Sequence, residues 1–376
     1  MLPNPFQKPL TEFKDTDPLK NREIVRELLG PEGVHKYRKI LGENLDVQNR
    51  GQKNVSREEL LAMAAEARKF QDAGKTAFEK SLEEQYETET RSLEEVGLLE
   101  TNERGVRGIT AIDSKFYALP SKERIQRHFA QEKYREKINQ GFTKLLIVPF
   151  GYSLKTLQGH YRTALLEHAA AKKLFDSDDN LIEGPFHGHW NDPVAVIYSL
   201  QHVKDIDDEE EKAQGMVYYP EIFNPHFHNG KTKEELLAGA DQPFPGFNVL
   251  LIKPDLTIHR KGDIKTQGNR TDIESQQSIP KYLEKLQTDP QYRLEQGFTL
   301  EDQIALSMTQ LQQTNKVIDD YENGVDSFND CIGAYFSNRG YVPYAGWSRK
   351  DNRVILRDVF VMNSENPARG VRLAVA

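Results

Sequence analysis

Apolar positions recur at helical spacing through the first third of the chain. Between Ser56 and Gly97, Leu, Ala, Phe and Tyr lie three or four residues apart, and Glu, Lys and Arg fill most positions between them. Ser56 followed by Glu59 is typical of a capping box at the start of a helix. The pattern predicts a long helix or helical hairpin with a narrow apolar stripe, ending at Gly97. A second helix is expected from Ser121 to Asn139.

Short apolar runs replace this pattern after Gly141. Residues 145–148, 247–252 and 257–259 have the length and composition of strands bounded by Pro and Gly. A helix is expected to begin after Ser153. A stronger helix has Thr299 as its N-cap with Asp302 three residues later, and we expect it to continue to Gly324. Its apolar side would carry Ile304, Met308, Leu311 and Ile318.

The last segment is rich in β-branched and aromatic residues. Asn, Gly, Ser and Pro divide it into four predicted strands, at 331–336, 340–347, 353–362 and 370–376. Val371, Leu373 and Val375 alternate with Arg372 and Ala374, so the final strand is expected to have one apolar face.

These patterns predict an α+β protein. Residues 1–20, with four prolines, form an extended arm, and residues 21–140 form a helical region with long charged helices. A mixed α/β region follows at 141–327, and residues 328–376 supply the C-terminal strands. The sequence leaves open whether the last two regions are one domain.

The C-terminal stretch "PYAGW…R…ARGVRLAV" resembles the closing strands of C-type-lectin-like and formylglycine-generating-enzyme-like domains. More narrowly, residues 328–376 resemble the variable proteins of diversity-generating retroelements. This resemblance implies a small antiparallel lectin-like sheet that serves as a scaffold. It also implies exposed residues, diversified by adenine-directed mutagenesis, that bind an unknown macromolecular ligand without catalysis, and we expect this ligand to be a protein. No "GGSW" stretch precedes the closing strand, which favours the compact lectin-like form.

The resemblance can be carried over residue by residue. The scaffold would include Trp347, Arg353, Val354, Leu356 and residues 370–373. The diversified part would include Ser348, Lys350, Asp351, Asn352, Arg357, Asp358 and residues 359–366. From this resemblance we expect the ligand-binding residues to be Tyr344, Trp347, Ser348, Arg349, Lys350, Asp351, Asn352, Arg357, Asp358, Phe360, Asn363, Glu365 and Asn366.

Two His-x-His pairs offer a different chemistry. The pairs are His187 with His189, and His226 with His228. In a strand, residues two apart face the same side, so each pair could present two imidazoles to one zinc or iron ion. The alternative function is therefore a metal-dependent enzyme; otherwise the sequence indicates no cofactor.

Composition narrows the remaining choices. A net charge of −8 argues against a dedicated nucleic-acid binder, because phosphate contacts require a clustered positive surface. The start "MLPNPFQKPLTEF" has no signal-peptide pattern, and no stretch approaches about 20 apolar residues, so we expect no membrane span. These features favour the cytoplasm and leave a surface destination by another route open. The charged N-terminal helices could also support a homo-oligomer, and a helical assembly protein is a third possible function.

Overall fold

Two of the most apolar segments of the chain pair with each other. Strands β4 (Lys144–Val148) and β7 (Asn248–Ile252) are antiparallel neighbours. Strand β16 (Leu373–Val375) pairs with β7, and β10 (Glu295–Gly297) pairs with β16, which gives the order β10-β16-β7-β4. The predicted strands at 145–148, at 247–252 and at the end of the chain are confirmed.

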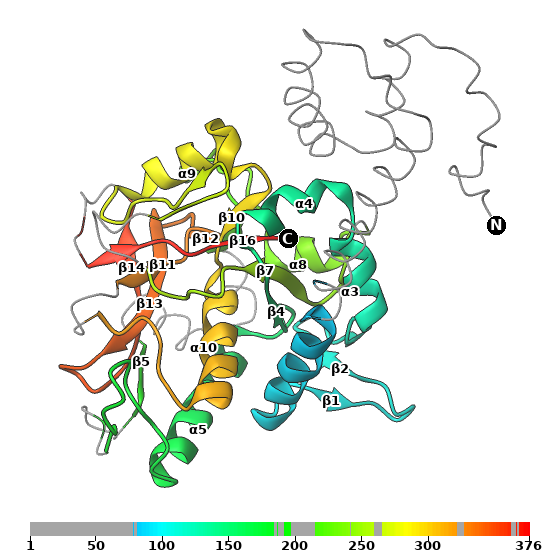
Figure 1. Cartoon of the computed structure of the whole chain (residues 1–376), viewed down its shortest axis with the longest axis vertical. Helices are drawn as coiled ribbons and strands as arrows, with labels where there is room; N and C mark the ends of the chain where they lie inside the picture. Colours follow the sequence, from blue (N-terminus) through cyan, green and yellow to red (C-terminus); the bar gives the residue numbers. More distant parts are fainter. Residues whose placement is uncertain are drawn as a thin grey trace, which may run out of the picture. The chain divides into compact units, whose positions relative to one another are not determined.

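The computed structural model describes Phe78 and residues 81–376, apart from residues 184–185, 187–191, 197–214, 241, 259–264, 322–326, 362–365 and 367. Ser81–Ala376 form one compact unit (Figure 1). The extended arm, the helix start at Ser56 and residues 21–77 of the helical region at 21–140 lie outside the described residues. Everything below concerns the unit that begins at Ser81.

The prediction that the final strand has one apolar face is wrong. Leu373, Ala374 and Val375 are all buried. Strand β16 lies between β10 and β7, so both of its edges are paired within the sheet. Ala374 packs with Leu146 and Leu306 in one core cluster, so both faces of the strand are covered.

A second, mixed sheet carries most of the C-terminal segment. Its path is β15 (Arg369–Gly370), β11 (Phe328–Asp330), β13 (Tyr341–Ser348), β12 (Ala334–Phe336) and β6 (Met216–Tyr218). Strand β14 (Arg353–Phe360) pairs with β13, and β5 (Val194–Val196) pairs with β14. The pairs β11–β15 and β5–β14 are parallel, so this sheet is not the purely antiparallel one that we expected. Because β16 belongs to the other sheet, the C-terminal segment contributes to both.

Helix α10 (Leu300–Thr314) connects the two sheets. It contacts β4 of one sheet and β13 of the other, and it packs on α5 (Leu154–Ala170), as Figure 1 shows. The predicted N-cap of α10 is confirmed, because Thr299 and Asp302 form a capping box. The helix predicted from Ser153 is α5, and the Ser153 side chain caps it. Helix α10 ends ten residues before Gly324, because Asn315 adopts a left-handed conformation with φ 60°.

The remaining helices surround this core. Residues 81–95 are helical, and the predicted end at Gly97 is confirmed by its φ of +72°. The single helix predicted from Ser121 to Asn139 is two helices, α3 (Lys122–Phe129) and α4 (Glu132–Asn139). Helices α8 (Lys233–Ala238) and α9 (Ile279–Thr288) complete the described set, with a short 3₁₀ helix at Pro290–Tyr292.

Smaller strands lie outside the two main sheets. Strands β1 (Glu100–Thr101), β2 (Arg107–Thr110) and β3 (Phe116–Ala118) form an antiparallel sheet, and β8 (Thr266–Gln267) pairs with β9 (Arg270–Thr271). The strand predicted at 257–259 is wrong for its described part, because residues 257 and 258 have no strand pairing.

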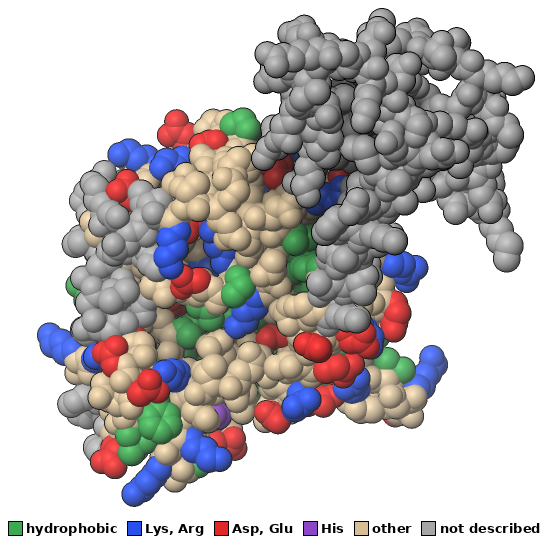
Figure 2. All heavy atoms as spheres, in the orientation of Figure 1, with side chains coloured by type: hydrophobic (Ala, Val, Ile, Leu, Met, Phe, Trp, Pro, Cys, Tyr) green, Lys and Arg blue, Asp and Glu red, His purple; other side chains and the backbone are tan. Residues whose placement is uncertain are grey.

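The described unit is therefore α+β, with helices and both antiparallel and mixed sheets. Acidic and basic side chains are interspersed over the coloured face in Figure 2. Among the described residues, every helix is too short or too polar to cross a membrane.

Arg372 ties the C-terminal strand to the centre of the molecule. Its guanidinium donates to both carboxylate oxygens of Asp319, at 3.0 and 2.7 Å, and to Gln303 Oε1 of α10 at 2.7 Å. Asn329 of β11 accepts from the Arg372 backbone N–H at 2.8 Å and donates to the same Gln303 oxygen. All these side chains are buried, so each depends on the others for its hydrogen bonds.

Removing one partner of this buried ion pair should be costly. We expect Arg372→Met to lower the free energy of unfolding by about 3–5 kcal/mol, because it leaves the Asp319 carboxylate buried without its counter-charge. Adding Asp319→Asn should restore part of the loss. Urea denaturation of both variants tests this, with Arg104→Met on the exposed β1–β2 loop as the control. A loss below about 1 kcal/mol for Arg372→Met would contradict it.

Glu89 is a second buried ionisable group, on the helix over residues 81–95. It is 2% exposed, and burial raises the pKa of its carboxyl to about 7, against the opposing effect of the Gln313 hydrogen bond at 2.8 Å. A raised pKa in the folded state means that folding favours the protonated form. The stability that this proton contributes is complete below pH 4.5 and is lost as the pH rises through about 7.

Glu89→Gln should remove this pH dependence. We expect the variant to match the wild type near pH 4.5 and to exceed it above pH 7 by up to about 3 kcal/mol, since one pKa unit corresponds to about 1.4 kcal/mol. Urea midpoints measured between pH 4.5 and 8 check this, with Glu84→Gln on the exposed side of the helix as the matched control. Parallel curves for wild type and Glu89→Gln would contradict the expectation.

Candidate ligand-binding pocket

The two long strands of the C-terminal segment form a hairpin that carries most of the predicted site. Strands β13 and β14 pair antiparallel from Tyr341 opposite Phe360 to Ser348 opposite Arg353. At about 3.3 Å per residue, the turn at Asn352 and the strand end at Phe360 are about 26 Å apart. The predicted ligand-binding residues therefore fall into two places, the hairpin turn and the open end of the hairpin.

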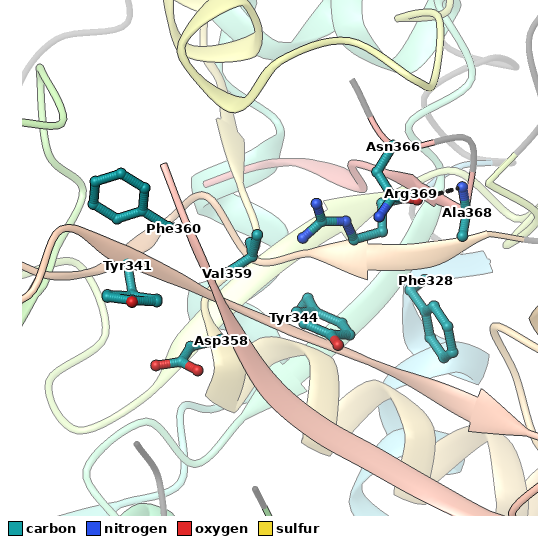
Figure 3. A pocket seen from close by; sticks show the side chains of 9 residues that line it. All are labelled: Phe328, Tyr341, Tyr344, Asp358, Val359, Phe360, Asn366, Ala368 and Arg369. Carbon is teal, nitrogen blue, oxygen red and sulfur yellow. Dashed lines mark hydrogen bonds between the residues drawn. The ribbon is translucent and has the colours of Figure 1, made fainter. Parts of the chain in front are cut away.

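A pocket lies at the open end. Its volume is about 540 Å³, within the range of small-molecule sites. Figure 3 shows side chains that line it from β11, β13, β14 and the segment leading into β15. The lining residues are Phe328, Tyr341, Tyr344, Asp358, Val359, Phe360, Asn366, Ala368 and Arg369. Four of these, Tyr344, Asp358, Phe360 and Asn366, belong to the predicted ligand-binding set.

Aromatic rings make up much of the pocket lining. Phe328 meets Tyr344 edge to face with 5.8 Å between centroids, and Tyr341 meets Phe360 at 5.5 Å. Phe360 is 40% exposed although it is large and apolar. Exposed aromatic surface of this kind provides large contact area with few rotatable bonds.

Arg369 is the basic group of the pocket. Its side chain is only 9% exposed, and its guanidinium carbon lies 5.4 Å from the centroid of the Tyr344 ring. Its Nε is buried and has no hydrogen-bond partner. The nearest carboxylate is Asp330, whose Oδ1 lies 3.6 Å from Arg369 Nη1 and also lacks a hydrogen-bond partner. Burial raises the pKa of the Asp330 carboxyl to about 7, and the Arg369 charge acts in the opposite direction.

Asp358 is the acidic residue of the pocket lining. It is half-buried, and this burial raises the pKa of its carboxyl, an effect that the charge of Arg339 opposes. Arg357, the preceding residue, lies opposite Tyr344 in the hairpin and is also half-buried.

The predicted residues at the hairpin turn lie away from the pocket. Lys350 is exposed, while Asp351 and Asn352 are half-buried. Ser348 is buried, and its hydroxyl accepts a hydrogen bond from the Asp351 N–H at 3.2 Å. Asn352 has a φ of 45°, a left-handed conformation that Asn tolerates in turns.

Arg349 anchors the hairpin turn through ion pairs. Its guanidinium donates to both carboxylate oxygens of Asp320, at 2.7–2.9 Å, and to Asp178 at 2.6 Å. These contacts, the Asp320 hydrogen bond foremost, raise the pKa of Arg349 above its ordinary value. Trp347, two residues earlier, is 1% exposed and packs in the interior. Both side chains are engaged with the protein itself.

The stretch at 359–366, expected to be diversified, mixes core and surface positions. Val359 and Val361 are buried and pack in a cluster with Tyr282 of α9, whereas Phe360 between them is exposed. Asn366 forms a turn, in which its Oδ1 accepts from the Ala368 N–H at 2.9 Å. Asn363 and Glu365 lie outside the described residues.

One of the two histidine pairs, His226 with His228, lies among the described residues. His187 and His189 lie outside the described part of the chain. His226 is exposed on the loop between β6 and α8, and His228 is half-buried, with its Nδ1 bonded to the Gly230 N–H at 3.0 Å. Within the described ranges, no group of three or more His, Cys, Asp or Glu side chains could hold a metal ion. Cys331 is fully buried, and this burial raises the pKa of its thiol.

Five lining residues were not in the predicted ligand-binding set: Phe328, Tyr341, Val359, Ala368 and Arg369. Phe328 and Arg369 reach the pocket because β11 and β15 are parallel neighbours, with Phe328 opposite Arg369. No local sequence pattern signals such a pairing across some forty residues. For Arg369 a partial signal exists, since the Asn-Pro dipeptide at 366–367 is typical of a turn.

Comparison with known proteins identified no relative of this chain. No protein-family model, no curated protein and no solved structure matches the chain. Functional inference therefore rests on the residues and geometry of the pocket.

The alternation along the end of β14 predicts opposite responses at neighbouring positions. Val361→Ser should lower the free energy of unfolding by about 2–3 kcal/mol, because it removes buried apolar volume and buries a hydroxyl. Phe360→Ser should cost less than about 1 kcal/mol, because the ring is partly in solvent. Urea denaturation of the two variants measures both values. Equal losses would contradict the assignment of Phe360 to the surface.

Proposed function

We propose that this chain is a non-catalytic ligand-binding protein whose C-terminal segment presents a recognition surface to a protein ligand. The observation that carries the proposal is the pocket at the open end of the β13–β14 hairpin. Every residue that lines it comes from 328–369, the segment that resembles retroelement variable proteins. Aromatic residues and an arginine dominate its lining, as in many recognition surfaces.

The strands beneath the pocket give this surface a rigid support. Val342, Ile355 and Leu356 are buried, and β13 is hydrogen-bonded on both sides. Exposed side chains on such a support can change without loss of the core, because they contribute little to packing. Lys350 and Phe360 meet this condition, Asp358 is half-buried, and Val359 and Val361 do not meet it.

We further propose that the segment is a compact lectin-like variable region, diversified at its exposed positions. The burial of individual residues makes this expectation more specific. Diversification that leaves the stability of the protein unchanged should avoid the core positions within 359–366. Substitution would then concentrate at Lys350, Asp351, Asp358 and Phe360 and at neighbouring exposed positions.

Sequencing the DNA around the gene tests this proposal. We expect a near-copy of the 3′ end of the gene that differs at adenines, together with a reverse-transcriptase gene nearby. The differences should fall in the codons of exposed residues such as Lys350 and Phe360, and should spare those of Trp347, Val354 and Arg372.

The same locus supplies the contradicting result. A locus with neither a near-copy nor a reverse transcriptase would remove diversification from the proposal. A near-copy whose differences fall equally on buried and exposed codons would contradict the division between scaffold and surface.

A further inference from the structure

Arg369 is a buried cation with unused hydrogen-bonding capacity beside a pocket. Its Nε is buried without a partner, and none of its guanidinium nitrogens donates a hydrogen bond to another described residue. Buried arginines ordinarily satisfy several of their five donors, because leaving a charged donor unpaired is costly. Figure 3 shows the Arg369 side chain extending along the pocket, between Val359 and Tyr344.

Asp330 does not accept a hydrogen bond from Arg369. The 3.6 Å between Asp330 Oδ1 and Arg369 Nη1 is too long for a hydrogen bond, and that oxygen has no hydrogen-bond partner. With its pKa raised to about 7 by burial, Asp330 is protonated for part of the time at neutral pH. The Arg369 charge is then only partly balanced from within the protein.

The surroundings of Arg369 favour one kind of anion. A guanidinium binds a carboxylate through two parallel hydrogen bonds. One guanidinium balances one negative charge, so a monoanionic carboxylate is a closer match than a dianionic phosphate, which would meet only one cation among the described lining residues. The Tyr344 ring lies against the guanidinium and Phe328 lies beside Tyr344, so apolar surface adjoins the charge.

From these contacts we infer that the pocket binds a carboxylate attached to an apolar or aromatic group, with Arg369 as the anchor of the carboxylate. The C-terminal residue of a peptide and a small aromatic acid share this chemistry. The inference rests on the proposed ligand-binding function and names the class of group that the pocket recognises.

N-acetylphenylalanine and its primary amide are matched probes for this inference. They differ in the carboxylate alone, and NMR titration of the protein measures the affinity of each. We expect the acid to bind about 10- to 100-fold more tightly than the amide, because charge-assisted hydrogen bonds to Arg369 are lost in the amide. The Arg369 Nε–Hε signal should shift with the acid and not with the amide.

Variants locate the effect. Arg369→Gln should abolish the preference for the acid, and Arg104→Gln, which removes the same charge from the exposed β1–β2 loop, should leave it unchanged. The Nε–Hε shift in wild-type protein decides the matter independently if Arg369→Gln fails to fold. A peptide that ends in phenylalanine distinguishes the two sources of the carboxylate. Tighter binding than that of N-acetylphenylalanine would identify a peptide terminus as the ligand, and equal or weaker binding would identify a small acid. Either result supports the inference.

Two results would overturn it. Equal affinity of acid and amide would show that the pocket binds apolar groups without using Arg369, which leaves the proposed recognition function standing. Ligands as small as these probes typically have a Kd in the millimolar range. If neither probe binds at a concentration about 10-fold above that range, the carboxylate site itself is excluded. The DNA test of diversification is unaffected by both results.

Discussion

The buried ion pair between Arg372 and Asp319 is the constraint on which the arrangement of this unit depends. It places a charged side chain from the last residues of the chain beside α10, the helix that contacts both sheets. Gln303 and Asn329 complete the network, so α10, β11 and the approach to β16 are fixed in one set of hydrogen bonds. Such a network specifies a single register, because every slip leaves buried polar groups unsatisfied.

This constraint explains why well-patterned strands lie at the end of the chain. The C-terminal segment crosses from the mixed sheet to the β10-β16-β7-β4 sheet and closes both. Once Arg372 is held, Arg369, three residues earlier, is held beside the pocket. The core therefore fixes the geometry of the pocket, while the exposed side chains of the pocket are not packed in the core.

Local patterns predicted much of the fold. The N-cap at Thr299, the helix start at Ser153 and the strands at 145–148 and 247–252 depend on neighbours in sequence, and all are present. The end of α10 could not be predicted, since it depends on the left-handed conformation of Asn315. The two buried faces of β16 depend on which strands flank it, and strand order is not written in a local period.

The site was predictable to a similar degree. The resemblance to variable proteins placed Tyr344, Asp358, Phe360 and Asn366 in the expected ligand-binding set, and the structure brings these four together. The pattern could not separate them from Arg349, whose acidic partners, Asp178 and Asp320, lie elsewhere in the sequence. It also could not find Phe328, which joins the pocket through a parallel strand pairing.

Amide hydrogen exchange, measured residue by residue on the native protein, tests most directly whether the C-terminal segment is locked into the core. If it is, the amides of Leu373, Ala374 and Val375 that are hydrogen-bonded exchange only through global unfolding, at the same free energy as those of β7. The amides of the hairpin turn at residues 349–352 exchange at a lower free energy. Exchange of the β16 amides at the rate of the turn would show that the segment opens independently, and would contradict this account.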